Sequence, residues 1–284
     1  VRITMCLYVA AAVIMMAVMN ARAMTGAVTG VMIAFLYYIV VSRKQFGGVT
    51  GDLAGFFLET AELAMFTGIL VTCIGRWQME IIWVRHFMTP GNRKKQYIGS
   101  TDEPLDEEMI PQDLKNYPQI DALTVSPMLR CRQTAERIWP SMPFETEPLM
   151  RELDFGEYER KTYEELKNEP VYQAWLDSGG AGAFPGGEDR EDFQKRCVQG
   201  AENMISRLIA EDCKRAGVVV HGGTIMAVLS AFDPEKRPFY HWQVCNGNGY
   251  ITDIDPEEWK KGVHLFYNVR ILHEIDITDG EKLR

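Results

Sequence analysis

The first quarter of the chain contains long uncharged apolar stretches. Two of them, residues 3–19 and 26–42, each run for about 17 residues without a charge, which is the lower limit for a helix that crosses the hydrocarbon core of a bilayer. Both predict transmembrane helices. A third stretch, residues 53–75, is also long enough, but it contains Glu59 and Glu62, whose charges are costly in lipid unless they face protein or a polar cavity. The alternative prediction for this stretch is an amphipathic or buried helix beside the membrane.

From residue 80 onward the pattern changes to short apolar runs separated by stretches with helical periodicity. EIIWV, ALTVS at 122–126 and GVVVH at 217–221 predict three buried strands. Residues 130–139 and 191–216 place apolar side chains at the i, i+3 and i+4 spacing of helices. Strands that alternate with helices are typical of an α/β domain with a parallel sheet.

Charge divides the chain near the same place. The formal net charge is −9, yet residues 1–75 hold four basic and three acidic residues, so almost the whole acidic excess lies in the remainder. We therefore expect a membrane region at residues 1–76 and a soluble domain at residues 77–284. An acidic domain lacks the basic face that nucleic-acid binding requires, whereas a local cluster of arginines still suits a small anionic substrate.

The six cysteines show no CxxC spacing. This pattern predicts neither a zinc site nor a disulfide framework and favours a reducing compartment.

Polar residues follow each predicted strand at the point where it ends. Arg85 and His86 come at the end of the first strand. Arg130 follows shortly after the second, and His221 ends the third. Ligands bind at the carboxyl ends of parallel strands in open α/β sheets, so we expect two imidazoles and two guanidiniums in one place. Guanidiniums bind phosphate oxygens in bidentate geometry, and a neutral imidazole can attack phosphorus to form a phosphohistidine. The pattern predicts phosphoryl chemistry that requires no metal.

Such a reaction also needs an acid that protonates the leaving oxygen. The segment LMRELDFGEYERKTYEEL at 149–166 offers Glu152, and a carboxyl group kept partly protonated by a secluded site can give a proton and later accept one from water. Asp154, Glu157 and Glu159 compete for this role, and spacing alone does not choose among them.

Five ordered motifs resemble those of the histidine phosphatase superfamily, also called the phosphoglycerate-mutase-like fold. The motifs are VRHFMTPGN, YIGSTDEPL, VSPMLRCRQTAE, RELDFGEYERKTYEEL and VVVHGGTIMAVL, and together they cover nearly all of residues 80–230. The resemblance implies a three-layer α/β domain with a mostly parallel sheet, preceded here by an all-α transmembrane segment. It also implies that His86 is the nucleophile and Glu152 the proton donor. The residues implied to bind the phosphoryl group and substrate are Arg85, Thr89, Asn92, Gly99, Arg130, His221 and Gly222.

Phe87 departs from this family pattern because it stands where the family has glycine. A glycine there allows a positive φ or a close approach of the backbone to the phosphate. We expect the phenylalanine either to narrow the pocket or to force a different turn, and so to affect rate and substrate choice more than the chemistry.

The first part of the chain resembles the C-terminal end of cobalamin synthase, the membrane enzyme that joins adenosylcobinamide-GDP to alpha-ribazole. The residues that carry this resemblance are Gly47, Gly48, Thr50, Gly51, Asp52, Gly55, Glu59 and Glu62. The aspartate-rich, magnesium-binding segments of that family lie further upstream, so Mg²⁺ is expected only for an intact synthase and no cofactor for the phosphatase. Since the chain begins with Val1 rather than Met, and its first apolar stretch starts at once without the basic n-region or cleavage site of a signal peptide, we expect a truncation upstream.

The second part looks most similar to the alpha-ribazole phosphatases. We therefore expect a phosphomonoesterase of cobalamin biosynthesis that removes the 5'-phosphate of alpha-ribazole phosphate or cobalamin 5'-phosphate. The alternatives are a broad-specificity sugar or phosphoglycerate-type phosphatase or mutase, and a catalytically decayed, membrane-anchored phosphate-binding module. Residues 1–75 predict an inner membrane location with the phosphatase domain in the cytoplasm. Arg43 and Lys44 favour a cytoplasmic turn after the second helix, which agrees with that location only if residues 53–75 do not span the membrane.

Overall fold

The computed structural model describes residues 21–45, 51–74, 78–114, 116–180 and 182–273. The chain divides into two compact units, Val1–Trp77 and Gln78–Arg284, and each is described by itself. The first predicted transmembrane helix, residues 3–19, lies outside the described residues, as do Gly47, Gly48 and Thr50.

The described part of the first unit consists of two long helices, α2 (Ala21–Gln45) and α3 (Gly51–Ile74). Their backbones approach closely, because a Cβ built on Gly30 would lie 2.0 Å from the carbonyl oxygen of Ala64, and one on Gly68 would lie 2.0 Å from that of Gly26. The order of these contacts makes the pair antiparallel. Small residues that let two apolar helices touch are typical of packing inside a membrane.

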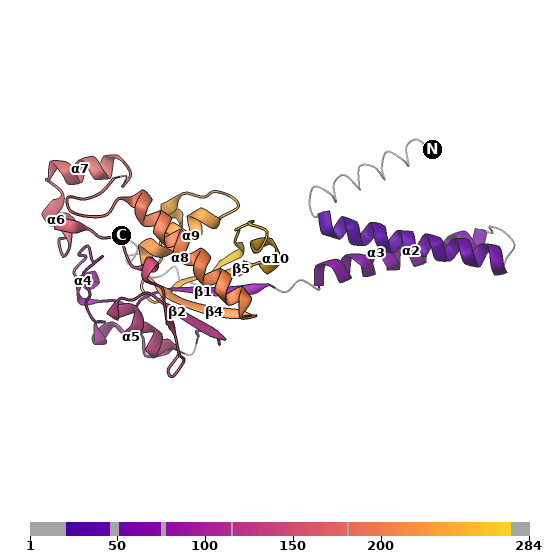
Figure 1. Ribbon diagram of the computed structural model, residues 1–284, viewed down its shortest axis with the longest axis horizontal. Helices are drawn as coiled ribbons and strands as arrows, with labels where there is room; N and C mark the ends of the chain where they lie inside the picture. Colours follow the sequence, from indigo (N-terminus) through magenta and orange to yellow (C-terminus); the bar gives the residue numbers. More distant parts are fainter. Residues whose placement is uncertain (1–20, 46–50, 75–77, 115, 181, 274–284) are drawn as a thin grey trace. The chain divides into compact units, whose positions relative to one another are not determined.

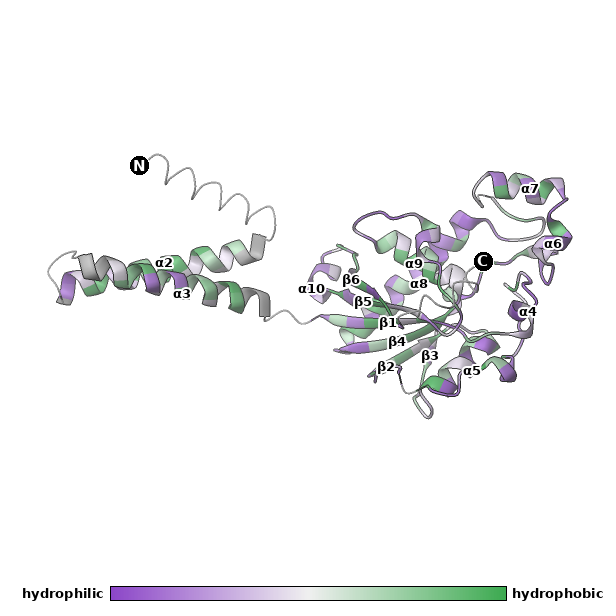
Figure 2. Cartoon of the chain, turned by 180° about the vertical axis from the view of Figure 1, so that it is seen from behind, coloured by the Kyte–Doolittle hydropathy of each residue, from purple (hydrophilic) through white to green (hydrophobic). Residues whose placement is uncertain are grey.

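The apolar stretch at residues 26–42 forms the predicted helix. Met24–Lys44 in α2 is, among the described residues, the one helix long and apolar enough to cross a membrane by length and composition. Hydrophobic residues are spread over both helices (Figure 2), and many of the large ones have exposed side chains, including Ile33, Leu36 and Leu63. Glu59 and Glu62 are also exposed on α3, so neither carboxylate is buried against α2.

The second unit is built on a six-stranded sheet with the order β3-β2-β4-β1-β5-β6. The strands are β1 (Met79–Arg85), β2 (Ala122–Val125), β3 (Glu145–Thr146), β4 (Arg215–Val220), β5 (Gly249–Ile254) and β6 (Tyr267–Ile271). The pairs β1–β4, β4–β2 and β2–β3 are parallel, whereas β5 and β6 join antiparallel. The α/β prediction with a mostly parallel sheet is confirmed.

Helices cover both faces of this sheet (Figure 1). The helices are α4 (Pro90–Arg93), α5 (Leu129–Ile138), α6 (Tyr163–Leu166), α7 (Pro170–Asp177), α8 (Arg190–Ala210), α9 (Gly222–Phe232) and α10 (Pro256–Trp259). Four short 3-10 helices lie at Glu107–Met109, Pro148–Met150, Gly156–Tyr158 and Phe239–Trp242. Helix α8 ends at Ala210 rather than at residue 216, because Asp212 adopts φ 58° and the next residues enter β4.

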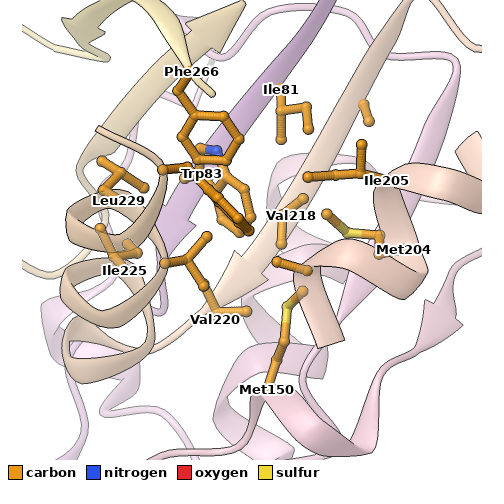
Figure 3. Packing of buried hydrophobic residues seen from close by; sticks show 14 of the residues in the cluster. Ile81, Trp83, Met150, Met204, Ile205, Val218, Val220, Ile225, Leu229 and Phe266 are labelled. Carbon is orange, nitrogen blue, oxygen red and sulfur yellow. The ribbon is translucent and has the colours of Figure 1, made fainter. Parts of the chain in front are cut away.

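Alternate residues of β1 separate two hydrophobic clusters. Ile81 and Trp83 pack with the inner faces of α8 and α9, and Figure 3 shows these side chains beside Ile205 and Ile225. Ile82 and Val84 belong to the opposite cluster, together with buried residues of α5. Because successive side chains of a strand point to opposite faces, one continuous apolar strand serves both layers.

The parallel register brings three strand ends to one edge. Arg85 at the end of β1 pairs with Val220, and Val125 at the end of β2 pairs with Val219. The residues that directly follow, His86 and Ser126, extend this pairing, since the His86 amide donates to Val220 O at 2.9 Å and the Ser126 amide to Val219 O at 3.0 Å.

Candidate active site

Two buried histidines lie at the carboxyl ends of β1 and β4. His86 follows β1, and His221 follows β4 at the N-terminus of α9. Their ring centroids are 5.2 Å apart in an edge-on arrangement. The structure therefore brings together the two imidazoles that the strand ends predicted.

The hydrogen bond of His86 leaves one ring nitrogen available as a nucleophile. Its Nδ1 lies 2.6 Å from the carbonyl oxygen of Phe87, and a carbonyl only accepts, so Nδ1 carries the proton. Burial, and then the charges of Arg130 and Arg85, lower the pKa of His86 well below its ordinary value. Nε2 of His86 is therefore an unprotonated nitrogen of a neutral ring, which is the form that attacks phosphorus.

Arg85 has a donor that the protein does not use. Its Nη1 donates to Val244 O at 2.6 Å, while Nε is buried without a hydrogen-bond partner among the described residues. Gly222 makes room for this group, because a Cβ there would lie 3.3 Å from both Cζ and Nε of Arg85. A buried unpaired donor is costly, and an anion at this edge would satisfy it.

Arg130 is fully buried at the start of α5 and donates in three directions. Nη1 donates to Thr101 O at 2.8 Å, Nη2 to Gly99 O at 2.9 Å, and Nε to Nδ1 of His221 at 3.3 Å. Gly99 is required there for steric reasons, because a Cβ would lie 1.8 Å from Leu153 O. Arg130 thus ties the Gly99–Thr101 segment to His221.

Thr89 and Asn92 form a capping box on the short helix α4. The Thr89 hydroxyl accepts from the Asn92 amide at 3.2 Å, and Oδ1 of Asn92 accepts from the Thr89 amide at 3.4 Å. Thr89 is fully buried. The pair fixes the turn after His86 and, because Oδ1 of Asn92 is already an acceptor, leaves its side-chain NH₂ group as a donor.

The contacts of the four acidic candidates distinguish Glu152 from the others. The carboxylate of Glu152 accepts from the amides of Leu153 at 2.9 Å and Gly223 at 3.0 Å. Burial raises its pKa, and this effect outweighs the lowering by those amides and by the nearby Arg130 and Arg85. A carboxyl group with a raised pKa is suited to give up a proton to a leaving group.

Of the other three acids, Glu159 and Asp154 accept hydrogen bonds that hold loops in place, and Glu157 lies at the surface. Glu159 accepts from the backbone amides of Gly99, Ser100, Thr101 and Phe155 at 2.9 to 3.3 Å. Asp154 accepts from the Gly156 amide and the Ser100 hydroxyl, and Glu157 is exposed.

A cavity of about 270 Å³ opens beside Glu152. Its lining combines backbone of two glycine-containing loops with charged side chains: Gly99, Ser100, Met128, Arg151, Glu152, Asp154, Gly186, Gly187, Glu188 and Arg196. Arg196 supports this wall, since its guanidinium pairs with Glu188 and donates to the carbonyl oxygen of Glu152 at 3.0 Å. The cavity is polar enough to receive the alcohol part of a phosphate ester.

Phe87 neither narrows this cavity nor strains the turn. Its side chain is 1% exposed and belongs to the hydrophobic cluster under α5, where it packs against Gly247 and Tyr117. Its φ is negative, as for most residues other than glycine, and its amide donates to the Thr134 hydroxyl at 2.9 Å. The expectation that Phe87 narrows the pocket was wrong, because the side chain points into the core and does not line this cavity. The expected change in the turn relative to the family stays a prediction.

Sequence reasoning did not assign two residues that shape the site. Ser126 was noted only as a strand end, yet its hydroxyl lies 2.7 Å from Nε2 of His221. Asn246 belongs to the sequence NGNG at 246–249, whose Asn-Gly pairs are typical of a turn, yet its side chain donates to His86 O at 2.9 Å. The position of Ser126 at the end of a strand was a usable signal, whereas nothing local distinguishes Asn246.

Two family models match the chain. Residues 81–268 match the histidine phosphatase superfamily, branch 1, and residues 1–70 match cobalamin-5-phosphate synthase. No curated protein matches the sequence.

Several solved structures share the fold of the second unit. One is a protein from Escherichia coli K-12, provisionally assigned as an alpha-ribazole-5'-P phosphatase, which is 22% identical and superposes with a TM-score of 0.58. The match covers 69% of this chain and 96% of the Escherichia coli chain. The alpha-ribazole phosphatase from Shigella flexneri is 23% identical with a TM-score of 0.54 and covers 62% and 91%. A mycobacterial glucosyl-3-phosphoglycerate phosphatase is 19% identical with a TM-score of 0.52 and covers 68% and 97%. These likenesses confirm the three-layer fold class.

Proposed function

The chain belongs to the histidine phosphatase superfamily, and from this we propose that its second unit hydrolyses phosphate monoesters through a phosphohistidine formed on His86. The two matched families support a cobalamin-related phosphatase. The proposed substrate is alpha-ribazole 5'-phosphate or cobalamin 5'-phosphate. The observation that carries the proposal is the neutral His86 beside His221, with Glu152 at the same sheet edge.

In the first proposed step, Nε2 of His86 forms a bond to phosphorus while the bond from phosphorus to the ester oxygen breaks. The Glu152 carboxyl group gives its proton to the departing alcohol. Arg85, with its unpaired Nε, and the Asn92 side-chain NH₂ group donate to the phosphoryl oxygens, whose negative charge they stabilise. The alcohol leaves through the cavity beside Glu152.

In the second step, the Glu152 carboxylate takes a proton from a water molecule, whose oxygen attacks the phosphohistidine. The bond from phosphorus to nitrogen breaks, inorganic phosphate forms, and His86 returns to its neutral state. Glu152 regains its proton, so each residue finishes the cycle as it began.

For location, we propose that α2 anchors the chain in a membrane and that the phosphatase unit lies on its cytoplasmic side. One apolar helix and the match of residues 1–70 to a membrane synthase support this arrangement. Protease protection of intact inside-out and right-side-out vesicles tests it. Cleavage of the phosphatase unit in right-side-out vesicles would contradict the cytoplasmic location.

Phosphate release from a panel of esters tests the proposed activity. The full chain, in detergent, is incubated with alpha-ribazole 5'-phosphate, cobalamin 5'-phosphate, 3-phosphoglycerate and p-nitrophenyl phosphate. We expect release from the first two at the highest kcat/KM, loss of activity in His86→Ala, and no change in His241→Ala, a control whose side chain is exposed. Release only from the other esters would favour a broad-specificity enzyme. No release from any ester, with His86→Ala equal to the parent, would exclude the activity.

A further inference from the structure

The loop Val244–Asn248 holds the turn that carries Arg85 and His86. It leads into β5, which pairs antiparallel with β1, so it lies beside the carboxyl end of β1. The Asn248 carbonyl accepts from the Arg85 amide at 2.9 Å, and the Gly247 amide donates to Arg85 O at 2.9 Å. The Val244 carbonyl accepts from Nη1 of Arg85. The loop therefore fixes the backbone of Arg85 and the direction of its guanidinium.

Asn246 connects this loop to two parts of the site at once. Its Nδ2 donates to the carbonyl oxygen of His86 at 2.9 Å and to Oδ1 of Asn92 at 3.3 Å. The same Oδ1 accepts from the Thr89 amide. With two donors directed at Oδ1, the amide of Asn92 has one preferred orientation, in which its NH₂ group faces away from Asn246.

This orientation decides how Asn92 meets an anion. An NH₂ group donates to a phosphoryl oxygen, whereas the inverted amide would present its carbonyl oxygen to a negatively charged group. An isolated asparagine side chain can adopt either orientation. The Asn246 donor favours the one that attracts phosphate.

Contacts with Phe87 and Tyr117 hold this loop against the turn after β1. Gly247 adopts φ 77°, and a Cβ there would lie 2.9 Å from Cδ1 of Phe87. The Tyr117 hydroxyl donates to Gly247 O at 2.5 Å. Phe87, which stands where the family has glycine, thus fills the space that a glycine leaves in the facing loop, and the two segments interlock.

We propose that Asn246 is a positioning residue, which aligns the Asn92 amide for a phosphoryl group. This inference rests on the proposed function, because it assumes that the anion bound at this edge is a phosphoryl group. Asn246 acts through Asn92 and needs no contact of its own with the substrate.

A double-mutant cycle with orthophosphate as the probe tests the inference. Calorimetry measures phosphate binding to the detergent-solubilised full chain in the parent, Asn246→Ala, Asn92→Ala and the double variant. Loss of one partner of a buried hydrogen bond is worth on the order of tenfold or more in affinity, so we expect about tenfold weaker binding in each single variant. Because Asn246 acts through Asn92, the double variant is expected to bind nearly as well as Asn92→Ala.

Two further variants separate positioning from general damage. Asn246→Gln keeps an amide donor and is expected to restore part of the affinity, whereas Asn203→Ala, an exposed site on α8, should bind phosphate like the parent. Additive losses in the double variant would overturn the inference, as would phosphate affinity unchanged in Asn246→Ala or no phosphate binding by the parent.

Turnover of p-nitrophenyl phosphate is measured on the same samples. Coupled phosphate binding without turnover by the parent would reject the proposed function and leave the positioning role standing. Turnover by the parent, together with additive binding losses in the double variant, would support the proposed function and reject the positioning role.

Discussion

The guanidinium of Arg130 donates from Nε to Nδ1 of His221 at 3.3 Å. A guanidinium is always protonated, so Nδ1 of His221 must accept. Burial, and then the charge of Arg130, lower the pKa of His221 well below its ordinary value, which keeps the ring neutral with its proton on Nε2. That proton faces the Ser126 hydroxyl at 2.7 Å. One ion thus sets both the tautomer and the direction of the second histidine.

Ser126→Ala is expected to lower kcat/KM by about tenfold to a hundredfold. The substitution removes the hydroxyl that accepts the Nε2 proton of His221 and leaves the weakly accepting Sγ of Cys131, at 3.5 Å, in its place. A poorly satisfied buried group costs about 1 to 3 kcal/mol. Steady-state kinetics of phosphate release measures the loss. Ser178→Ala, at the exposed end of α7, serves as the control, and equal kcat/KM for the two variants would contradict the assignment.

The pH dependence of kcat/KM is expected to be bell-shaped, with its acidic limb below the ordinary histidine range and its alkaline limb above the ordinary glutamate range. Burial lowers the pKa of His86, so the nucleophile stays neutral down to a pH below the ordinary histidine range. Burial raises the pKa of Glu152, so the acid stays protonated above the ordinary glutamate range and activity falls as the pH rises through that pKa.

Glu152→Gln tests the assignment of the alkaline limb. We expect this variant to lose the limb and to lose about 10²- to 10⁴-fold in rate on an alkyl phosphate. The loss should be smaller on p-nitrophenyl phosphate, whose leaving group needs little protonation. Equal losses on the two esters would show that Glu152 is not the proton donor.

Glu159→Gln is expected to destabilise the second unit by about 1 to 3 kcal/mol and to raise KM. Both carboxylate oxygens accept backbone amides of the Gly99–Thr101 segment, and an amide supplies only one acceptor. That segment presents its carbonyls to Arg130, so its loosening reaches the site. Urea unfolding and KM measure the two effects, with the exposed Glu157→Gln as the control. A KM equal to that of the control would limit Glu159 to stability.

Phe87→Ala is expected to cost about 3 to 5 kcal/mol of unfolding free energy, because it empties a space in a packed core. Because the ring also packs against Gly247 in the loop that carries Asn246, KM for the ester is expected to rise in the protein that remains folded. Thermal unfolding and kinetics at a low temperature measure both effects. Tyr240→Ala, at an exposed ring, provides the comparison, and a lower KM with unchanged stability would place Phe87 in the pocket instead.

Gly30→Ala is expected to weaken the packing of α2 on α3. A Cβ at Gly30 would lie 2.0 Å from Ala64 O, whereas one at Gly55 meets nothing within 4 Å. Gly55→Ala is therefore a matched control, which helix propensity alone should stabilise slightly. The packing of α2 on α3 in the two variants is compared by the protease resistance of the detergent-solubilised chain at increasing temperature. Equal resistance of the two variants would argue against a close contact at Gly30.

Much of the fold and of the site's composition followed from sequence. The apolar runs predicted β1, β2 and β4, and the polar residues at their ends predicted that His86 and His221 would meet. This prediction succeeded because neighbouring parallel strands run in the same direction, so their carboxyl ends lie at the same edge of the sheet. The helix over residues 191–216 was placed too long, since the turn at Asp212 depends on how β4 enters the sheet.

The contacts within the site depended on tertiary structure. Spacing along the sequence did not distinguish Glu152 from the other three candidate proton donors. What separates Glu152 from Glu159 is the set of backbone amides around each carboxylate. The direction of Phe87 depends on space left by Gly247 in a distant segment. Asn246 looked like part of an ordinary turn, because its two acceptors come from elsewhere in the chain.

The sequence by itself determined the two-part organisation, the α/β alternation and the set of residues delivered to the strand ends, because these depend on periodicity and local chemistry. Only the tertiary structure decided which histidine nitrogen is free, which carboxyl group has a raised pKa and where Phe87 points. Protonation and side-chain direction are set by neighbours that the fold brings from other segments, and no local pattern records them.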